Sequence, residues 1–296
     1  MPVPQRIAIT GASGLIGTAL VGHLKSEGHT VQRLVRRAPV GADEVQWDPQ
    51  TGFVDLEPLR GVDAIIHLAG VGVGDKRWNK KYKSEILNSR LLGTTAIAHA
   101  VAELKPQVFI SASAIGWYGE SGNRAVVETD RAGDDFLAAV CREWEGAADL
   151  AGDTRTVKIR TGLVLDPTGG ALGKMLPLFR LGLGGKMGNG KQWWSWITLH
   201  DQIRAIVFAL ENPISGPVNL TAPNPVTNQE FTSALARAMH RPALFPVPGI
   251  ALKIALGGFS SEILGSKKVI PHALQEAGFT WDYPHISEAL GKLVED

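Results

Sequence analysis

The chain of 296 residues has a single cysteine, Cys141. One thiol can form neither an internal disulfide nor a cysteine-built metal site, and such scarcity is typical of a reducing compartment. The eight histidines show no paired spacing of the kind that binds zinc. We therefore predict a cytoplasmic protein without a metal centre.

An excess of charge is also missing. Thirty Lys and Arg residues oppose 29 Asp and Glu residues, and no long run of either sign occurs. This balance predicts neither a nucleic-acid patch nor an acidic tail. No apolar run approaches the roughly 20 residues of a membrane helix, and the N-terminus lacks the apolar stretch of a signal peptide. We expect a small-molecule partner, with no nucleic acid and no membrane.

What is present is an alternation of short apolar runs and amphipathic stretches. The expected strands are 7–10, 30–35, 45–48, 63–69, 107–113 and 156–161, and the expected helices are 15–25, 80–104 and 134–150. Strand, helix and strand in this order imply right-handed crossovers and helices on both faces of a parallel sheet. The predicted fold is therefore α/β, a doubly wound parallel sheet of the Rossmann type.

The regular alternation of strands and helices ends after residue 161. Residues 162–190 are rich in glycine, which predicts loops and turns, and later helices are expected at 200–212, 227–240 and 250–256. We predict three parts. They are a Rossmann domain over 1–165, to which 200–225 returns, substrate-side loops and helices over 166–245, and a small, mostly helical C-terminal domain over 246–296.

The sharpest motif is TGASGLIG, residues 10–17, between the first strand and the first helix. Glycines here allow a tight turn, a close approach of the backbone to a pyrophosphate, and close packing of helix on strand. The helix N-terminus adds free N–H groups and a positive dipole end. The predicted dinucleotide contacts in this turn are Gly11, Ser13, Gly14, Leu15, Ile16 and Gly17.

The second strand ends with Arg36 and Arg37, where a dinucleotide site usually reads the adenosine ribose. An acid there would repel a 2′-phosphate, whereas guanidinium groups pair with it. The sequence therefore predicts NADP(H), with Arg36 ahead of Arg37. Two solvated surface arginines would give the same pattern.

The spacing Thr-Gly-x-x-Gly-x-x-Gly resembles the extended short-chain dehydrogenase/reductase (SDR) family. HLAG, residues 67–70, resembles the family's turn against the cofactor, which implies contacts from Leu68, Ala69 and Gly70, with His67 structural. In RLLGT, residues 90–94, Arg90 replaces the usual asparagine, which implies a cation beside the cofactor or an anionic ligand. Trp47-Asp48 stands either where the family places an acid near the adenine or in a plain turn.

The catalytic Tyr-x-x-x-Lys pair of that family is absent. The chain has three tyrosines, and none is followed four residues later by lysine. The expected positions hold Phe136 and Val140, or Leu137 and Cys141, none of which replaces the pair at neutral pH. SASAIGWYG, residues 111–119, still resembles the family's serine–tyrosine stretch, which implies catalytic roles for Ser113 and Tyr118. A strand-end serine and a packing tyrosine are equally compatible with it.

These departures resemble one subgroup, the atypical SDR proteins of the YfcH type, called epimerase family proteins, which carry a C-terminal domain of unknown function. The resemblance covers nearly the whole chain and includes RTGLVLDPTGGAL (160–172), WSWITLHD (194–201) and FPVPGIALKIALGG (245–258). It implies a cofactor and a fold but no assigned reaction.

A substrate is expected beyond the carboxyl ends of the strands. The predicted contacts are Arg160 as an anion anchor and Trp194 and Trp196 as an apolar wall. The alternatives are a salt bridge from Arg160 to Asp166 or Asp201, and tryptophans that seal the C-terminal part onto the sheet. A homodimer is usual for SDRs.

Three functions follow from this set. The first is an NADP(H)-dependent oxidoreductase acting on an unidentified small molecule. The second is a sensor or regulatory protein that binds NADP(H) without turnover. The third, an epimerase or dehydratase of nucleotide sugars, needs a proton-transfer residue that the sequence does not show.

Overall fold

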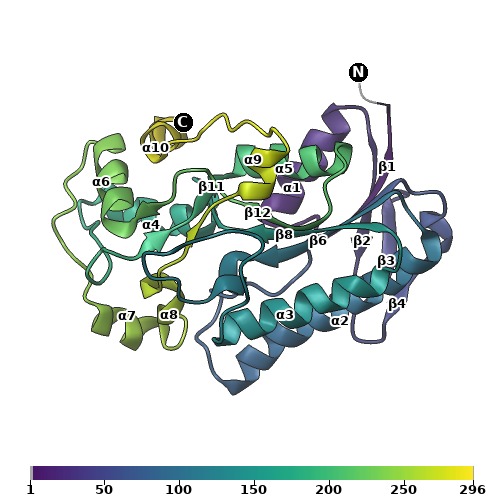
Figure 1. Ribbon diagram of the computed structural model, residues 1–296, viewed down its shortest axis with the longest axis horizontal. Coiled ribbons are helices and arrows are strands. Elements are labelled where there is room, and N and C mark those ends of the chain that lie inside the picture. Colours follow the sequence, from purple (N-terminus) through teal and green to yellow (C-terminus); the bar gives the residue numbers. More distant parts are fainter. Residues whose placement is uncertain (1–2, 296) are drawn as a thin grey trace.

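The computed structural model describes residues 3–295, and its centre is an eight-stranded sheet in the order β12-β8-β6-β5-β1-β2-β3-β4 (Figure 1). The strands are β1 (Arg6–Thr10), β2 (Thr30–Val35), β3 (Glu44–Asp48), β4 (Phe53–Val54), β5 (Ala64–His67), β6 (Val108–Ala114), β8 (Arg155–Thr161) and β12 (Gly216–Leu220). All pairs are parallel except β3–β4. The predicted doubly wound fold is confirmed, and the strand order reverses between β1 and β5.

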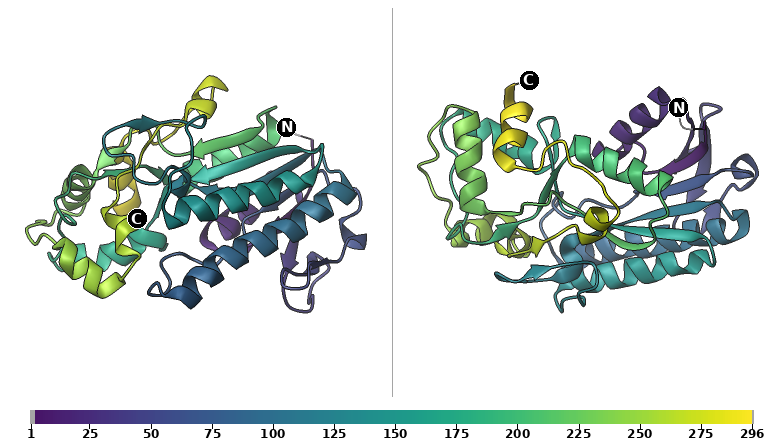
Figure 2. Two further views of the ribbon diagram at one scale, coloured as in Figure 1. Left: turned by 60° about the horizontal axis from the view of Figure 1, so that its bottom comes forward. Right: turned by 45° about the horizontal axis from the view of Figure 1, so that its top comes forward.

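Helices cover both faces of this sheet because its central strands are apolar on both sides. Ile7 and Ile9 of β1 pack with α1 (Leu15–Ser26) and α5 (Leu199–Glu211), whereas Ala8 between them packs with α2 (Lys80–Leu104). The long helices α2 and α3 (Phe136–Ala148) run side by side on that second face (Figures 1 and 2).

A second, mostly helical lobe lies at the other end of the molecule (Figure 2). Its helices are α4 (Gly170–Arg180), α6 (Asn228–Ala238), α7 (Gly249–Leu256), α8 (Ser260–Leu264) and α10 (Ile286–Glu295), whereas α9 (His272–Glu276) packs on β12 with Leu274 in the core of the sheet. Its short strands are β9 (Leu163–Asp166), β10 (Trp193–Trp194), β11 (Trp196–Thr198) and β13 (Val226–Thr227). A further pair, β7 (Ala125–Val126) with β14 (Lys268–Val269), ties the C-terminal segment back to the sheet region.

The lobe has one core of its own. Phe179 of α4, Trp196 of β11, Phe231 of α6 and Leu290 of α10 are buried in it together. Residues of the segments 166–245 and 246–296 therefore share a core, while α5 and β12 belong to the sheet.

The short strands β4, β7, β9, β10, β11, β13 and β14 were not predicted, and two longer elements also differ from the prediction. The glycine-rich stretch 162–190 is not only loop, because α4 occupies Gly170–Arg180 within it. Its apolar residues Leu172, Leu176 and Phe179 recur at helical spacing and are buried. The many glycines around them made this helical pattern hard to recognise in the sequence. The strand β12 was expected only as part of a returning segment, because Pro217 in GPVNL disfavours a strand. Pro217 is tolerated since β12 lies at the edge of the sheet.

No helix within residues 3–295 is long and apolar enough to cross a membrane.

Candidate functional site

A cleft of about 1500 Å³ opens at the carboxyl ends of β1, β2 and β5, where the strand order reverses. We call it the glycine-loop cleft. Three segments line it: the first turn (11–14), the end of β2 with the residues after it (33–37), and the turn after β5 (68–72). The first helical turns of α2 close its remaining side.

The first turn has the shape that a bound phosphate requires. Gly11 has φ of 69°, a conformation that favours glycine. A Cβ on Gly17 would lie 2.1 Å from the carbonyl oxygen of Gly11, so helix and turn pack in direct contact. Helix α1 begins after Gly14 with no side-chain cap and no acid in its first turn. Its N–H groups are therefore available to an anion.

The turn residues differ in what they present. Gly11, Ser13 and Gly14 line the glycine-loop cleft. The side chains of Leu15 and Ile16 do not: Leu15 lies against Gly169 and Gly170, and Ile16 packs on the core under α1. Any contact from these two residues comes from the backbone at the helix start.

Thr10 and His67 lock this turn to the one after β5. The Thr10 hydroxyl oxygen accepts hydrogen bonds from the N–H groups of Leu68 (3.1 Å) and Ala69 (3.3 Å) and lies 2.7 Å from His67 Nδ1. Burial lowers the pKa of His67 to about 3, so the imidazole is neutral and Nδ1 accepts the threonine proton. His67 is structural, and Leu68, Ala69 and Gly70 line the cleft as expected.

Three arginines, Arg33, Arg36 and Arg37, lie in the cleft at the end of β2, where a dinucleotide would place its adenosine ribose. We call this part of the cleft the ribose end. Arg37 donates to both carboxylate oxygens of Glu44, at 2.6 and 2.7 Å, and Arg33 pairs with Asp43 and Glu44. The hydrogen bonds from Arg37 and from the N–H of Val40 lower the pKa of Glu44 to about 2.

Arg36 is exposed, lines the cleft, and makes no hydrogen bond or ion pair within residues 3–295. It is the cation left for an incoming anion, ahead of Arg37 as the sequence indicated. Asp48 accepts from the N–H of Gln50 at 2.9 Å in a turn, while Trp47, Pro49 and Gln50 line the cleft, so both alternatives for Trp47-Asp48 stay open.

The sequence reasoning missed the polar side of the cleft that α2 supplies. The lining residues that α2 supplies are Lys81, Ser84, Glu85, Asn88 and Ser89, and Asp75 of the preceding loop lies beside them. The spacing of 81, 85 and 88–89 is that of one helix face, a signal that was present in the sequence but had no motif to mark it.

Arg90 lies behind Gly70, whose added Cβ would stand 3.6 Å from the Arg90 Cζ, and its contact with the cofactor or an anionic ligand stays a prediction. Its Nη1 donates to the carbonyl oxygens of Val71 (2.9 Å) and Ile86 (3.1 Å), and its Cζ lies 4.8 Å from the ring centroid of Trp144. Arg90 thus connects the turn after β5 to α2 through these two hydrogen bonds.

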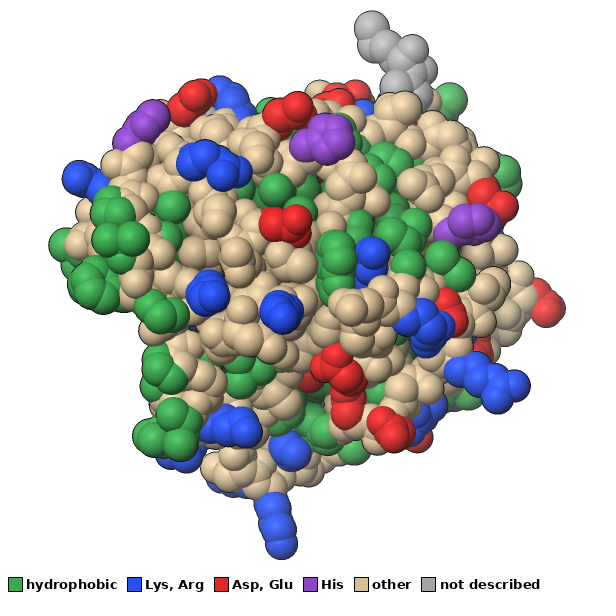
Figure 3. All heavy atoms as spheres, turned by 60° about the vertical axis from the view of Figure 1, so that its left-hand side comes forward, with side chains coloured by type: hydrophobic (Ala, Val, Ile, Leu, Met, Phe, Trp, Pro, Cys, Tyr) green, Lys and Arg blue, Asp and Glu red, His purple; other side chains and the backbone are tan. Residues whose placement is uncertain are grey.

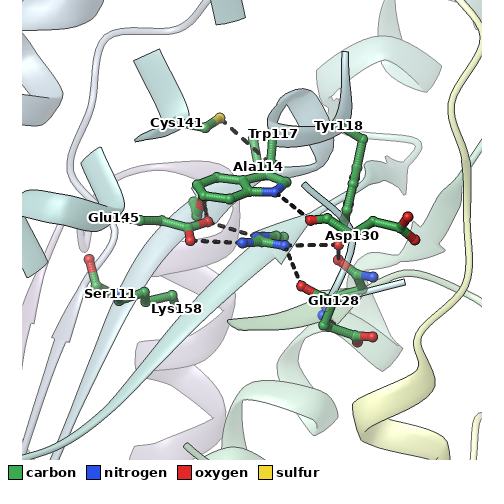
Figure 4. A network of polar contacts seen from close by, with 12 residues as sticks. Ser111, Ala114, Trp117, Tyr118, Glu128, Asp130, Cys141, Glu145 and Lys158 are labelled. Atoms are coloured by element: carbon green, nitrogen blue, oxygen red, sulfur yellow. Dashed lines mark hydrogen bonds and ion pairs between the residues drawn. The ribbon is translucent and has the colours of Figure 1, made fainter. Parts of the chain in front are cut away.

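Tyr118 and Glu145 belong to a buried polar network (Figure 4). Ser113 and Arg160 are part of the same network. Arg160 donates through Nε and Nη2 to the two oxygens of Glu145, at 2.8 and 2.9 Å, and the Ser113 hydroxyl donates to the same carboxylate at 2.7 Å. Nη1 of Arg160 lies 3.0 Å from the Tyr118 hydroxyl, which donates to Asn219 at 2.7 Å. This network joins β6, β8, α3 and β12.

The network leaves these groups no free face toward the glycine-loop cleft. Arg160 is 2% exposed and Tyr118 4%, and neither they nor Ser113 line that cleft. The Trp117 ring centroid lies 3.9 Å from the Arg160 guanidinium. Burial raises the pKa of Tyr118 to about 12, so the phenol stays protonated. Arg160 is therefore salt-bridged, to Glu145 rather than to the acids considered from sequence, and the catalytic roles of Ser113 and Tyr118 stay predictions.

The tryptophans belong to the lobe. Trp196 is fully buried and donates from Nε1 to the Asn224 carbonyl at 3.1 Å, and Trp194 packs on Phe231 with ring centroids 5.2 Å apart. Neither lines the glycine-loop cleft, so the sealing alternative describes their position.

Three potential metal ligands do come together, although none was expected. Atoms of His200, Asp201 and Asp282 lie within 4.8 Å of one another. Their acceptors are already occupied: Arg204 donates to Asp201 at 2.8 Å and contacts Asp282 at 3.1 Å, and His200 lies 2.7 Å from Asp282. The group forms an ion-pair cluster between α5 and the chain before α10.

A glycine-rich first turn at the switch point of a doubly wound sheet defines a dinucleotide-binding protein of the SDR class. Comparison with known proteins gives the family: a model described as NAD dependent epimerase/dehydratase family matches residues 7–138, and a domain of unknown function (DUF1731) matches 247–293. The chain belongs to the NAD dependent epimerase/dehydratase family, in the subgroup that carries this C-terminal domain.

Its relatives match over most of their length. An epimerase family protein of Mycobacterium leprae is 46% identical over 96% of this chain and 94% of its own. The human epimerase family protein SDR39U1, solved with NADPH, is 34% identical with a TM-score of 0.91 and covers 98% of this chain and 99% of its own. A structure described as a nucleoside-diphosphate sugar epimerase from Corynebacterium glutamicum is 37% identical with a TM-score of 0.80, over 99% of this chain but only 59% of its own.

Proposed function

We propose that this protein binds NADP(H) in the glycine-loop cleft and acts as an oxidoreductase on a small molecule. The observation that carries the cofactor choice is the ribose end, where the one buried acid, Glu44, is neutralised by Arg37 while Arg36 is left without a partner. A 2′-phosphate would meet a free guanidinium and no free carboxylate. The human relative's structure with NADPH supports the same choice.

Bound NADPH supplies a hydride, and the chain has to orient the acceptor and exchange a proton with it. Lys81 and Glu85 lie on one face of α2 at the cleft and are placed to do so, with Lys76 3.5 Å from the Glu85 carboxylate. The Ser89 hydroxyl on the same face already bonds to the N–H of Val71 and the carbonyl oxygen of Ile86. In this proposal Lys81 and Glu85 take over the proton transfer that the missing Tyr-x-x-x-Lys pair performs in related enzymes. We propose them ahead of Ser113 and Tyr118, whose hydroxyls act only if the Arg160–Glu145 network opens.

The cofactor proposal is tested by titrating the protein with NADPH and NADH while following energy transfer from tryptophan to the reduced nicotinamide. Arg36→Asp should weaken NADPH binding about ten- to a hundredfold, the loss of one or two charge-assisted hydrogen bonds, and change NADH binding little. Arg131→Asp, at an exposed arginine outside the cleft, is the matched control. Binding of neither dinucleotide, or equal losses for both, would refute the proposal.

A second candidate is a sensor that binds NADP(H) without turnover, which the buried, fully bonded hydroxyls of Ser113 and Tyr118 favour. A panel of aldehydes and ketones, followed by loss of NADPH absorbance, separates the two. Turnover that falls in Lys81→Met or Glu85→Gln at unchanged NADPH affinity supports the oxidoreductase. Tight binding with no turnover on any carbonyl supports the sensor. Epimerisation of a nucleotide sugar ranks third, and the homodimer and the cytoplasmic location remain proposals.

A further inference from the structure

Seven large apolar side chains are exposed at the end of the lobe farthest from the sheet. They are Leu178, Leu181, Leu183, Leu244, Phe245, Ile250 and Ile254, with exposed fractions from 51% to 73%. Only four other large apolar residues in the described chain are comparably exposed, and those are scattered. We call the seven the apolar end. Figure 3 shows apolar side chains gathered along the left-hand border of this face, with Lys and Arg nearby.

The two segments that supply the apolar end are joined by backbone contacts. The N–H of Val247 donates to the Lys186 carbonyl, and the N–H of Gly188 donates to the Val247 carbonyl, both at 2.9 Å. Gly185 lies so close to Phe245 that a Cβ would stand 1.9 Å from its carbonyl oxygen. Monomeric proteins rarely expose contiguous apolar patches larger than a few hundred Å², and such patches usually mark a binding surface. We therefore ask what binds to the apolar end.

The same segments carry charge of one sign only. Residues 167–200 and 231–261 contain no Asp or Glu. Their basic residues are Lys174, Arg180, Lys186, Lys191, Arg237, Arg241 and Lys253. Within residues 3–295 none of these seven makes an ion pair. Because the whole chain is nearly neutral, at a formal +1, this asymmetry is local.

Basic and apolar side chains alternate along the surface. Arg180 stands between Leu178 and Leu181, and Lys253 between Ile250 and Ile254 on α7. The occupant must therefore accept aliphatic side chains and supply anions at the same face. A second copy of this chain would bring Arg180 and Lys253 of one apolar end toward those of the other in a two-fold interface, with no acid in either segment to pair them, which disfavours self-association.

We propose that the apolar end docks on an anionic lipid surface, with its leucines and isoleucines inserted at the headgroup boundary and its lysines and arginines on lipid phosphates. The sequence predicted no membrane partner because no segment is long enough to span a bilayer. Surface contact needs no such segment. It needs residues 178–183 and 244–254 side by side, which only the fold provides.

The test is sedimentation of the full chain with sonicated vesicles, either phosphatidylcholine alone or phosphatidylcholine with about a third phosphatidylglycerol. We expect at least tenfold stronger partition into the anionic vesicles, weakening as salt rises. Arg180→Glu/Lys253→Glu should reduce this partition at least tenfold. Ile250→Ser/Ile254→Ser should reduce it by a similar factor at unchanged charge.

Phe53→Ser is the matched control, since Phe53 is 50% exposed on β4, far from the lobe, and should bind vesicles like the wild type. NADPH affinity and far-UV circular dichroism should be unchanged in all variants, which keeps this test separate from the proposed function. Equal sedimentation with and without anionic vesicles at low salt overturns the proposal. So does binding to poly-glutamate without binding to vesicles, which would assign the surface to an acidic protein, or a dimer that Ile250→Ser/Ile254→Ser dissociates.

Discussion

At the scale of single residues, the contact between Gly17 and Gly11 is the most demanding feature of the fold. A side chain at Gly17 would meet backbone, which cannot move aside as a flexible side chain does. Gly17→Ala should therefore lower the free energy of unfolding by roughly 1–3 kcal/mol, or more, and weaken NADPH binding, as measured by urea denaturation and titration. Gly22 lies in the same helix, and a Cβ there would have no other atom within 4 Å, so Gly22→Ala should instead stabilise by about 0.5–1 kcal/mol. Equal effects at both sites would show that helix propensity, and not the contact, decides.

The buried Tyr118 predicts how the free energy of unfolding depends on pH. Burial raises its pKa from 10.0 to about 12, so between these values the folded protein holds a proton that the unfolded chain has lost. Stability falls with rising pH in that window, and at pH 11 the loss from this one group is about 1.4 kcal/mol relative to pH 8. Tyr118→Phe should be less stable than the wild type at pH 8, because it loses the bonds to Asn219 and Arg160, but should lose about 1.4 kcal/mol less between pH 8 and pH 11. Urea midpoints at the two pH values check this, and parallel losses in both proteins would contradict it.

At the scale of elements, the Arg160–Glu145 pair joins β8 to α3. Both side chains are buried, so removing one partner leaves the other charged and without a counter-ion. Glu145→Ala should cost about 3–5 kcal/mol in urea denaturation, and Arg160→Met combined with Glu145→Met should recover part of that loss. The exposed pair Arg60–Glu57 is the control, and Arg60→Ala should change stability by less than about 1 kcal/mol. A double variant no more stable than Glu145→Ala would contradict the argument.

The elements also show what the sequence could and could not predict. The first turn, the strands 7–10 and 30–35 and the helix 80–104 were predictable because local pattern and tertiary role agree there. The same reasoning separated Arg36 from Arg37 only by position, whereas the partner that distinguishes them, Glu44, comes from the neighbouring strand β3. Helix α4 and the polar face of α2 were missed since glycines masked the first and no motif marks the second. The burial of Ser113 and Arg160 depends on Glu145 and Asn219, which are distant in sequence and could not be paired with them in advance.

At the scale of the whole molecule, the lobe and the sheet are linked too closely to behave as separate modules. The Ser195 hydroxyl bonds to both Lys267 and Val269 of the C-terminal segment, β14 pairs with β7, and α10 packs on α6 in the core of the lobe. These links predict that the lobe and the sheet unfold as one cooperative unit.

We therefore expect tryptophan fluorescence and far-UV circular dichroism to report coincident urea transitions for the full chain. Leu290→Ala, which empties a fully buried position between α10 and α6, should shift that single transition by about 2–5 kcal/mol for both probes. Leu150→Ala, at a residue that is 46% exposed on the sheet domain, should change it little. Two resolved transitions, or a Leu290→Ala effect seen by only one probe, would mean that the C-terminal domain folds on its own. A single transition would mean that the lobe does not unfold separately, so that the apolar end and the glycine-loop cleft are present in the same folded state.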